Sequence, residues 1–290
     1  MSDKQNNLTK TRSKLPSKEE EKEITLNEDE EISPGLKSDI IETAVSGDVE
    51  AYIKLMDNEE NQNPSDQRGF TPLHIAATKG HFELFDFIFK NAEENNPATV
   101  DGDTPFHMAA KYGHYEICKL IISGQKNKNP KNHNGCTPLF VGAHHGHFKI
   151  CEMIIQNIKD KNPVTKTGLT PLHAAARAGY FKICRLIMEN VKDRNPSNPQ
   201  NGRTPLHYAA RNGHLKICGL IRANVKDKNP EDFKGLTPHA LARKHVDKLF
   251  EENEEKSSVL LKKSVPKEPI ESPEGQRRSK RKRKTTSEQV

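Results

Sequence analysis

The chain has 290 residues, of which 32% are hydrophobic; it contains no tryptophan and carries a formal net charge of +6. This length suits one large domain or two ordinary ones, but the low hydrophobic fraction leaves part of the chain without a core to pack against. No apolar run reaches the roughly 18 residues of a membrane span, and the first residues lack the apolar stretch of a secretory signal. These properties argue against a membrane protein and predict a soluble, intracellular one.

Residues 1–36 form the first segment. They are polar and rich in Lys, Glu, Asn and Ser. Such a segment cannot bury enough apolar surface to fold on its own, so we expect it to be disordered.

From residue 37 onward the chain repeats itself. The dipeptide Thr-Pro occurs at residues 71, 104, 137, 170, 204 and 237, and a glycine stands two residues before each threonine. Residues 38–64 fit the same register without the dipeptide. A fixed period of about 33 residues is typical of stacked supersecondary units. The predicted units lie at 38–64, 65–97, 98–130, 131–163, 164–196, 197–230 and 231–250.

Each unit is predicted to contain two short helices. Threonine is a favoured N-cap, and proline is tolerated at the first helical position because its missing N–H is not needed there. The first helix therefore begins at the Thr-Pro pair and ends about eight residues later at a glycine. These glycines are residues 80, 113, 146, 179 and 213. A second run follows with apolar residues at helical spacing, as in Phe148, Ile150, Cys151 and Ile154.

The second helix is expected to end at a column of asparagine and glycine. The column consists of Asn58, Asn91, Gly124, Asn157, Asn190 and Asn224. Both residue types tolerate the left-handed conformation that closes many helices. The chain then passes through KDKNP at 159–163 and 226–230 and through KDRNP at 192–196, where proline forces the preceding asparagine to be extended. We interpret this motif as an exit and a spacer with solvated charges.

The recurring segments TPLHIAA, TPFHMAA, TPLHAAA and TPLHYAA resemble the ankyrin repeat, whose period is about 33 residues and whose pattern is T-P-L-H-x-A. The resemblance covers residues 37–250 and implies an all-α solenoid of about seven helix-turn-helix units joined by hairpin-like loops. It also implies that the histidines of this motif make hydrogen bonds that tie neighbouring units together. They are His74, His107, His173 and His207. One departure is that the family's helix-ending Gly is absent, and Asn one residue earlier takes its place.

The cysteines and the remaining histidines are predicted to be structural. Four cysteines share one repeat column, in which the second unit has Phe85, so the column favours a core residue over a thiolate. They are Cys118, Cys151, Cys184 and Cys218. An odd total of five suits reduced thiols. The segment HHGH at 144–147 is interrupted by a helix-breaking glycine, which argues against a zinc site. We therefore expect no catalysis, no metal and no cofactor.

The exposed end of each first helix is a candidate binding surface. In the ankyrin family, protein partners usually dock on the concave face formed by these helix ends and by the hairpin tips. The seventh and eighth residues after each threonine include no acid. The candidate protein-binding residues are Lys79, Lys111, Tyr112, His144, His145, Arg177, Arg211 and Lys244, with Arg203 from a hairpin tip. The surface is either a groove for an acidic or phosphorylated partner segment or a solvated, mildly basic face.

Residues 251–290 are expected to form a disordered tail with a basic cluster at 277–284. Its cations are Arg277, Arg278, Lys280, Arg281, Lys282, Arg283 and Lys284. This density of charge indicates a nuclear import signal, read by an importin-type receptor. The alternatives are weak, nonspecific binding to nucleic acid and a solvated tail. No aromatic residue is interleaved with the cations, so base stacking is not expected.

These patterns predict a monomeric, non-catalytic adaptor or scaffold that binds partner proteins through its concave face and enters the nucleus. Two alternatives stay open. One is a nucleic-acid-associated regulatory factor that uses the basic tail for affinity. The other is a purely cytoplasmic scaffold.

Overall fold

The computed structural model describes residues 38–57 and 63–242, all within one compact unit of the chain, Met1–Leu249. The regular secondary structure of these residues is entirely α-helical, which confirms the predicted fold class. The helices are α1 (Ser38–Ser46), α2 (Val49–Met56), α3 (Pro72–Lys79), α4 (Phe82–Asn91), α5 (Pro105–Tyr112), α6 (Tyr115–Gly124), α7 (Pro138–His145), α8 (Phe148–Asn157), α9 (Pro171–Ala178), α10 (Phe181–Asn190), α11 (Pro205–Asn212), α12 (Leu215–Asn224) and α13 (Pro238–Leu241). The segments 1–36 and 251–290, expected to be disordered, lie outside the described residues.

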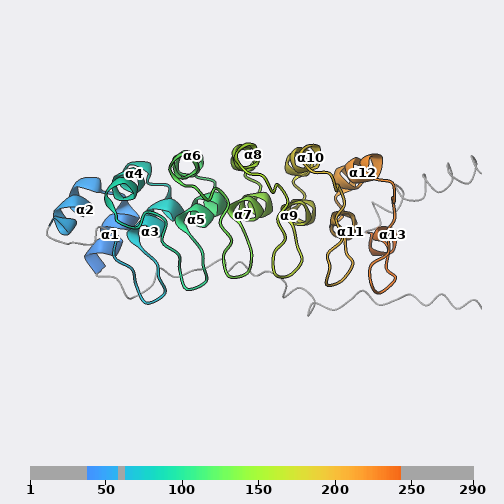
Figure 1. Ribbon diagram of the computed structural model, residues 1–290, viewed down its shortest axis with the longest axis horizontal. Helices are drawn as coiled ribbons and strands as arrows, with labels where there is room; N and C mark the ends of the chain where they lie inside the picture. Colours follow the sequence, from blue (N-terminus) through green and yellow to red (C-terminus); the bar gives the residue numbers. More distant parts are fainter. Residues whose placement is uncertain (1–37, 58–62, 243–290) are drawn as a thin grey trace, which may run out of the picture. The chain divides into compact units, whose positions relative to one another are not determined.

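The helices stack in two layers. Each first helix from α3 to α11 contacts the first helix of the next unit, and each second helix from α2 to α10 contacts the second helix of the next unit. The two helices of a unit also contact each other from α1 and α2 to α11 and α12. Figure 1 shows the first helices in one row, between the row of second helices and the loops. A unit can bury its apolar faces only against its neighbours in this arrangement, which is the expected solenoid.

The ends of the first helix follow from local chemistry, as predicted. Thr71 is the extended N-cap of α3, and Pro72 takes the first helical position. Gly80 ends the helix with a φ of 81°, in the left-handed region that favours glycine. A Cβ at Gly80 would also collide with the ring of His114 from the next unit. The same cap, proline and left-handed glycine recur in α5, α7, α9 and α11.

The end of the second helix differs from the expectation. Gly124 is helical and is absent from the glycines with positive φ, and the residue after Asn91, Ala92, is extended at φ −74° and ψ 139°. The left-handed closure predicted for this column is therefore wrong. Asparagine acts here through its side chain: the amide of Asn91 donates to the carbonyl of Phe87 at 2.7 Å, and Asn157, Asn190 and Asn224 make the same bond four residues back. The side chain thus adds a hydrogen bond to the last turn of the helix.

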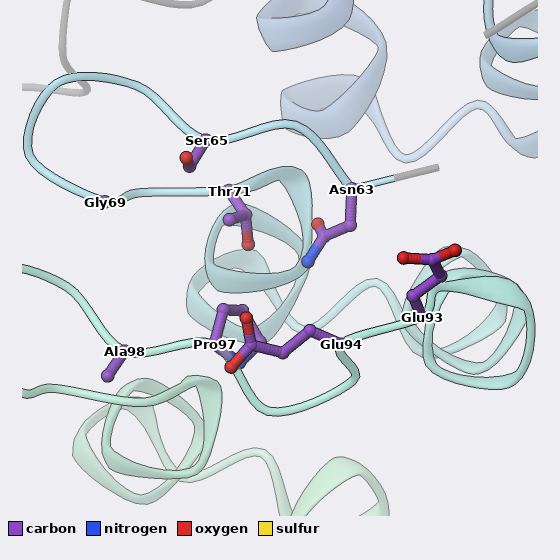
Figure 2. Close-up of a pocket in the computed structure, with 8 residues that line it drawn as sticks. All are labelled: Asn63, Ser65, Gly69, Thr71, Glu93, Glu94, Pro97 and Ala98. Carbon is purple, nitrogen blue, oxygen red and sulfur yellow. The ribbon is translucent and has the colours of Figure 1, made fainter. Parts of the chain in front are cut away.

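The loop from the second helix to the next unit, which we call the exit loop, is more than a spacer. In KDKNP of the fourth unit, Asp160 accepts from the amide of Asn162 at 3.2 Å, and Lys161 donates to the carbonyl of Ile155 at 2.7 Å. Asn162 accepts from the amide of Leu172 at 3.1 Å, ten residues on, in the first turn of α9. Asn63, Asn129, Asn195 and Asn229 make the equivalent contact (Figure 2 shows Asn63). The asparagine of one unit thus caps the first helix of the next.

The histidines of the TPLH motif join successive units, as the resemblance implied. The Nδ1 atom of His74 accepts from the amide of Thr71 at 3.2 Å, so the ring carries its proton on Nε2 and donates to the carbonyl of Asp103 in the next unit at 3.1 Å. His107, His173 and His207 make the same pair of bonds. Each ring thus caps its own helix and holds the next hairpin loop.

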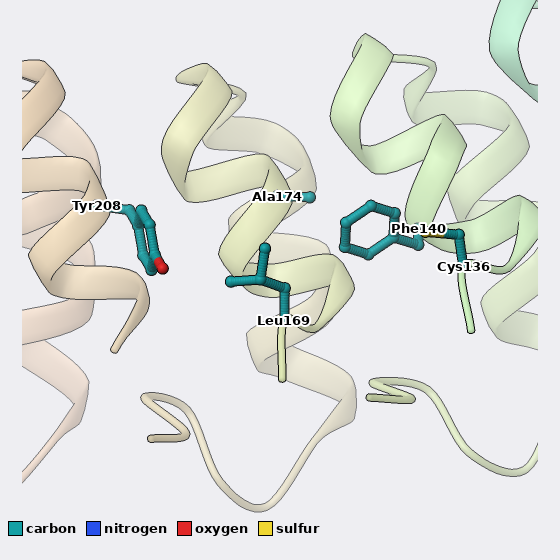
Figure 3. Close-up of a cluster of buried hydrophobic side chains, with 5 residues drawn as sticks. All are labelled: Cys136, Phe140, Leu169, Ala174 and Tyr208. Atoms are coloured by element: carbon teal, nitrogen blue, oxygen red, sulfur yellow. The ribbon is translucent and has the colours of Figure 1, made fainter. Parts of the chain in front are cut away.

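The fourth unit replaces this contact with an apolar one. Phe140 occupies the histidine position and is 1% exposed. It belongs to a buried cluster with Cys136, Leu169, Ala174 and Tyr208, contributed by three successive units. Figure 3 shows the Phe140 ring facing α9, with Leu169 and Ala174 lying between it and Tyr208. The repeat therefore tolerates either a hydrogen bond or apolar packing at this position.

A second histidine column points the other way along the array. The Nε2 atoms of His81, His114, His147 and His214 lie 2.8–3.0 Å from carbonyl oxygens near the end of the preceding unit's first helix. The bond satisfies a helix-end carbonyl. The second, third and sixth units therefore reach both of their neighbours through histidine hydrogen bonds, whereas the fifth unit has Tyr180 in this column.

Candidate protein-binding site

The predicted concave residues lie on the last turn of successive first helices. We call the four residues Lys111, His144, Arg177 and Arg211 the basic row; each is the next-to-last residue of its helix, in α5, α7, α9 and α11. All four are half-buried. Because each of these helices contacts the next, the row runs from one unit to its neighbour without a break. Cations on a last turn also interact favourably with the helix dipole, which gives the row a structural role as well.

The middle of the row carries rings. The ammonium of Lys111 lies 5.4 Å from the ring centroid of Tyr112, whose side chain is 43% exposed. The rings of His144 and His145 meet edge to face, with centroids 5.0 Å apart. Exposed aromatic groups beside cations are typical anchors of protein interfaces.

His145 is neutral at physiological pH. Burial is the main cause that lowers its pKa, to about 4, and the positive charges of His144 and Lys111 lower it further. Its Nε2 atom is buried and has no hydrogen-bond partner among the described residues. His145 therefore adds a ring edge beside the basic row and no positive charge.

Not every predicted residue lies on this surface. Lys79 is exposed at the end of α3, in line with Tyr112 and His145. Arg203 is 8% exposed, and its Nε atom pairs with Asp232 of the next hairpin loop at 3.1 Å. It joins two loops instead of facing a partner. Lys244 and the tail cations at 277–284 lie outside the described residues.

Asp232 is held in its charged form. Desolvation raises its pKa, but the amides of Leu236 and Lys234 and the guanidinium of Arg203 more than offset this effect, so the pKa lies below its usual value. The sequence could not place Arg203, because its partner belongs to another unit 29 residues away.

The reactive residue types are engaged in structure. The five cysteines are buried as free thiols, and burial raises the pKa of Cys151, Cys184 and Cys218 to about 12, which leaves little thiolate. In the part of the chain that the structure describes, no group of three His, Cys, Asp or Glu residues could hold a metal. Within 38–57 and 63–242, none of the helices has the length and apolar character needed to span a bilayer.

Comparison with known families agrees with this geometry. The model for "Ankyrin repeats (3 copies)" matches residues 83–165 and 154–232, and the model for a single "Ankyrin repeat" matches residues 68–97. The chain belongs to the ankyrin repeat family. No curated protein matches it significantly. Ankyrin repeats generally mediate protein–protein interactions, and repeat arrays use their extended concave surfaces for binding.

Proposed function

We propose that this ankyrin repeat protein is a non-catalytic adaptor that binds an acidic or phosphorylated segment of a partner protein along the basic row. The observation that carries the proposal is the continuity of Lys111, His144, Arg177 and Arg211 over four stacked helix ends with no acid among them. An extended anionic ligand meets several of these charges at once, and a contact to a desolvated cation contributes about 1.5–3 kcal/mol.

The two arginines are the main determinants of this interaction. A guanidinium binds carboxylate or phosphate through two parallel hydrogen bonds, whereas an ammonium acts as a point charge. Tyr112 and His145 supply flat, partly apolar surface beside them. This combination favours a protein segment over a free anion, because the rings need side chains to contact.

We further propose that the protein enters the nucleus through the basic cluster at 277–284, read by an importin-type receptor. Replacing Arg281, Lys282, Arg283 and Lys284 with alanine is expected to shift a fluorescent fusion to the cytoplasm without changing its melting temperature. Unchanged nuclear accumulation would support the cytoplasmic alternative or another route of entry. A DNA affinity that depends steeply on salt and is lost with the tail would favour the nucleic-acid alternative.

The basic row is tested by reversing its charge. The intact protein, R177E/R211E and the control K182E/K216E are used to capture partners from a cell extract, with quantification by mass spectrometry. Lys182 and Lys216 are exposed on α10 and α12, in the same two units, so the control makes an equal change in net charge on a different surface. The principal captured protein is expected to be lost with R177E/R211E and retained with K182E/K216E. Equal capture by all three proteins would show that the row is only a solvated face.

A further inference from the structure

The array carries a second basic surface, distinct from the basic row. A cleft of about 380 Å³ opens between two successive exit loops, at residues 126–131 and 157–163. Four of the side chains that line it are lysines, and one is an acid. The lysines are Lys126, Lys128, Lys131 and Lys159, and the acid is Asp160. We call this surface the exit-loop cleft.

The lysines of the exit-loop cleft are not needed to finish the helices. At the third position of the motif, Lys161 donates to the carbonyl of Ile155 and Arg194 to that of Met188, but neither residue lines this cleft, and Lys128, at the same position of the third unit, makes no such bond within the described residues. Lys126 and Lys159 are exposed and Lys128 is half-buried, and none of the three has a hydrogen bond or ion pair in the described part of the chain. Their ammonium groups are therefore available to a ligand.

The fold does not require positive charge at this place. Two units earlier, an equivalent cleft of about 570 Å³ is lined by Glu93 and Glu94, which occupy the positions of Lys159 and Asp160. Figure 2 shows these glutamates on the loop after α4, across from Asn63 and Thr71 on the preceding loop. Because the same loop geometry accepts acids in one unit and lysines in another, the sign of the charge is independent of the architecture.

Lysines continue beyond the cleft at the equivalent position of the following units. The first position of the exit-loop motif is Lys126, Lys159, Lys192 and Lys226 in the third to sixth units, and all four side chains are exposed. Neighbouring helices pack about 8–10 Å apart, and an extended chain rises about 3.3 Å per residue. Successive lysines thus match every third residue of an extended peptide.

The lining of the cleft suits a peptide better than a polynucleotide. Asp160 has a carboxylate oxygen besides the one that accepts from the amide of Asn162, and a peptide N–H can donate to this oxygen whereas a phosphate cannot. No aromatic side chain lines this cleft, so bases have nothing on which to stack.

We propose that the exit-loop cleft, continued by Lys192 and Lys226, binds an extended acidic peptide segment with carboxylates at about every third residue. The lysines pair with the carboxylates of the peptide, and Asp160 accepts from a backbone N–H of the peptide. This site is separate from the basic row, so the protein would hold two acidic segments, or two stretches of one partner, on different surfaces.

The test uses a fluorescent peptide of five Glu-Ser-Ala repeats, with fluorescence anisotropy measured at low and physiological salt. The cleft variant is K126E/K128E/K159E, and the matched control is K149E/K182E/K216E, which reverses three exposed, unpaired lysines on α8, α10 and α12. Circular dichroism checks that all variants keep their helical content. Affinity is expected to fall about tenfold or more in the cleft variant and to change by less than about twofold in the control.

Four outcomes would overturn the proposal. One is an equal loss in both triple variants, which would mean that the peptide senses only net charge. Another is tighter binding of an oligothymidylate than of the peptide, with loss in the cleft variant, which would mark a nucleic-acid surface. The third is binding that survives in the cleft variant but is lost in R177E/R211E, which would place the peptide on the basic row and leave the proposed function intact. No binding to the intact protein at low salt would also refute the cleft without bearing on partner capture.

Discussion

The second and fourth units have the same backbone architecture but carry different side chains at equivalent positions. In the second unit His74 donates to the carbonyl of Asp103, whereas in the fourth unit Phe140 packs in an apolar cluster. The exit loop of the second unit carries Glu93 and Glu94, and that of the fourth carries Lys159 and Asp160. The units nevertheless have the same helix lengths and the same left-handed glycine caps.

This comparison separates what the fold needs from what it merely tolerates. The N-cap threonine, the following proline and the closing glycine fix the backbone and are present in both units. The contact between first helices is required, but its chemistry is interchangeable. The exposed side chain at the first position of the exit loop makes no hydrogen bond or ion pair in either unit within the described residues, so its charge can vary.

The largest expected effect is a loss of stability at low pH, which applies to units with a buried histidine and not to the fourth unit with Phe140. Burial lowers the pKa of His74 and His173 from 6.5 to about 4, whereas an unfolded chain takes up these protons near pH 6.5. Stability is therefore complete above pH 6.5 and is lost as the pH falls toward 4. Each of the two histidines is expected to cost roughly 2 kcal/mol between pH 7 and pH 5, measured by urea unfolding.

The variant His74→Phe copies the fourth unit and serves as the control. It is expected to lower stability at pH 7, because the cap on Thr71 is lost, but also to lose less stability between pH 7 and pH 5 than the wild type. Carboxylates titrate equally in both proteins, so the difference isolates the ring. An identical pH dependence in the two proteins would contradict the buried neutral histidine.

Local chemistry was predictable from the sequence, and contacts between units largely were not. Pro72 and Gly80 determine where α3 begins and ends through their own backbone preferences, so these bounds follow from the residue types. The hydrogen bond from Leu172 to Asn162 and that from His114 to the carbonyl of Thr78 depend on the path of the loops and on stacking. Periodicity shows that such columns recur but does not show what they touch.

Ambiguous residue types explain the errors. Asparagine ends helices either through a left-handed backbone or through its side chain, and the sequence cannot distinguish the two, so the mechanism at Asn91 was mistaken. An arginine at a hairpin tip suggests a binding residue as long as no intramolecular partner is known. Arg203 pairs with Asp232 of the next hairpin loop. The exit-loop cleft was missed because its lysines look like ordinary solvated charges. The signal was the change from Glu93 to Lys126 and Lys159 within one column.

A smaller effect is expected from the asparagine that caps the next unit. Asn162 accepts from the amide of Leu172, so Asn162→Ala should cost about 1 kcal/mol by leaving a helix-end amide without its partner. Asn96 is the counterpart in the second unit, but its side-chain oxygen is buried and has no hydrogen-bond partner within 38–57 and 63–242. Asn96→Ala should therefore be neutral or slightly stabilising in urea unfolding. Equal losses in both variants would show that the asparagines act through the loop backbone instead of the cap.

The smallest effect on stability is expected from exchanging the charge of the second exit loop. Glu93 and Glu94 are exposed and make no hydrogen bond or ion pair in the described part of the chain. The variant E93K/E94D copies Lys159 and Asp160. It should change the free energy of unfolding by less than about 0.5 kcal/mol. The same variant extends the lysine column by one unit and should strengthen binding of the Glu-Ser-Ala peptide two- to threefold, since an exposed charge pair contributes at most about 1 kcal/mol. The reverse change, Lys159→Glu, should weaken binding by a similar factor. A gain in peptide affinity without loss of stability would establish that this loop position serves the ligand and not the fold. A loss of more than about 1 kcal/mol in the free energy of unfolding would mean that Glu93 supports the second unit and that the two loops are not interchangeable.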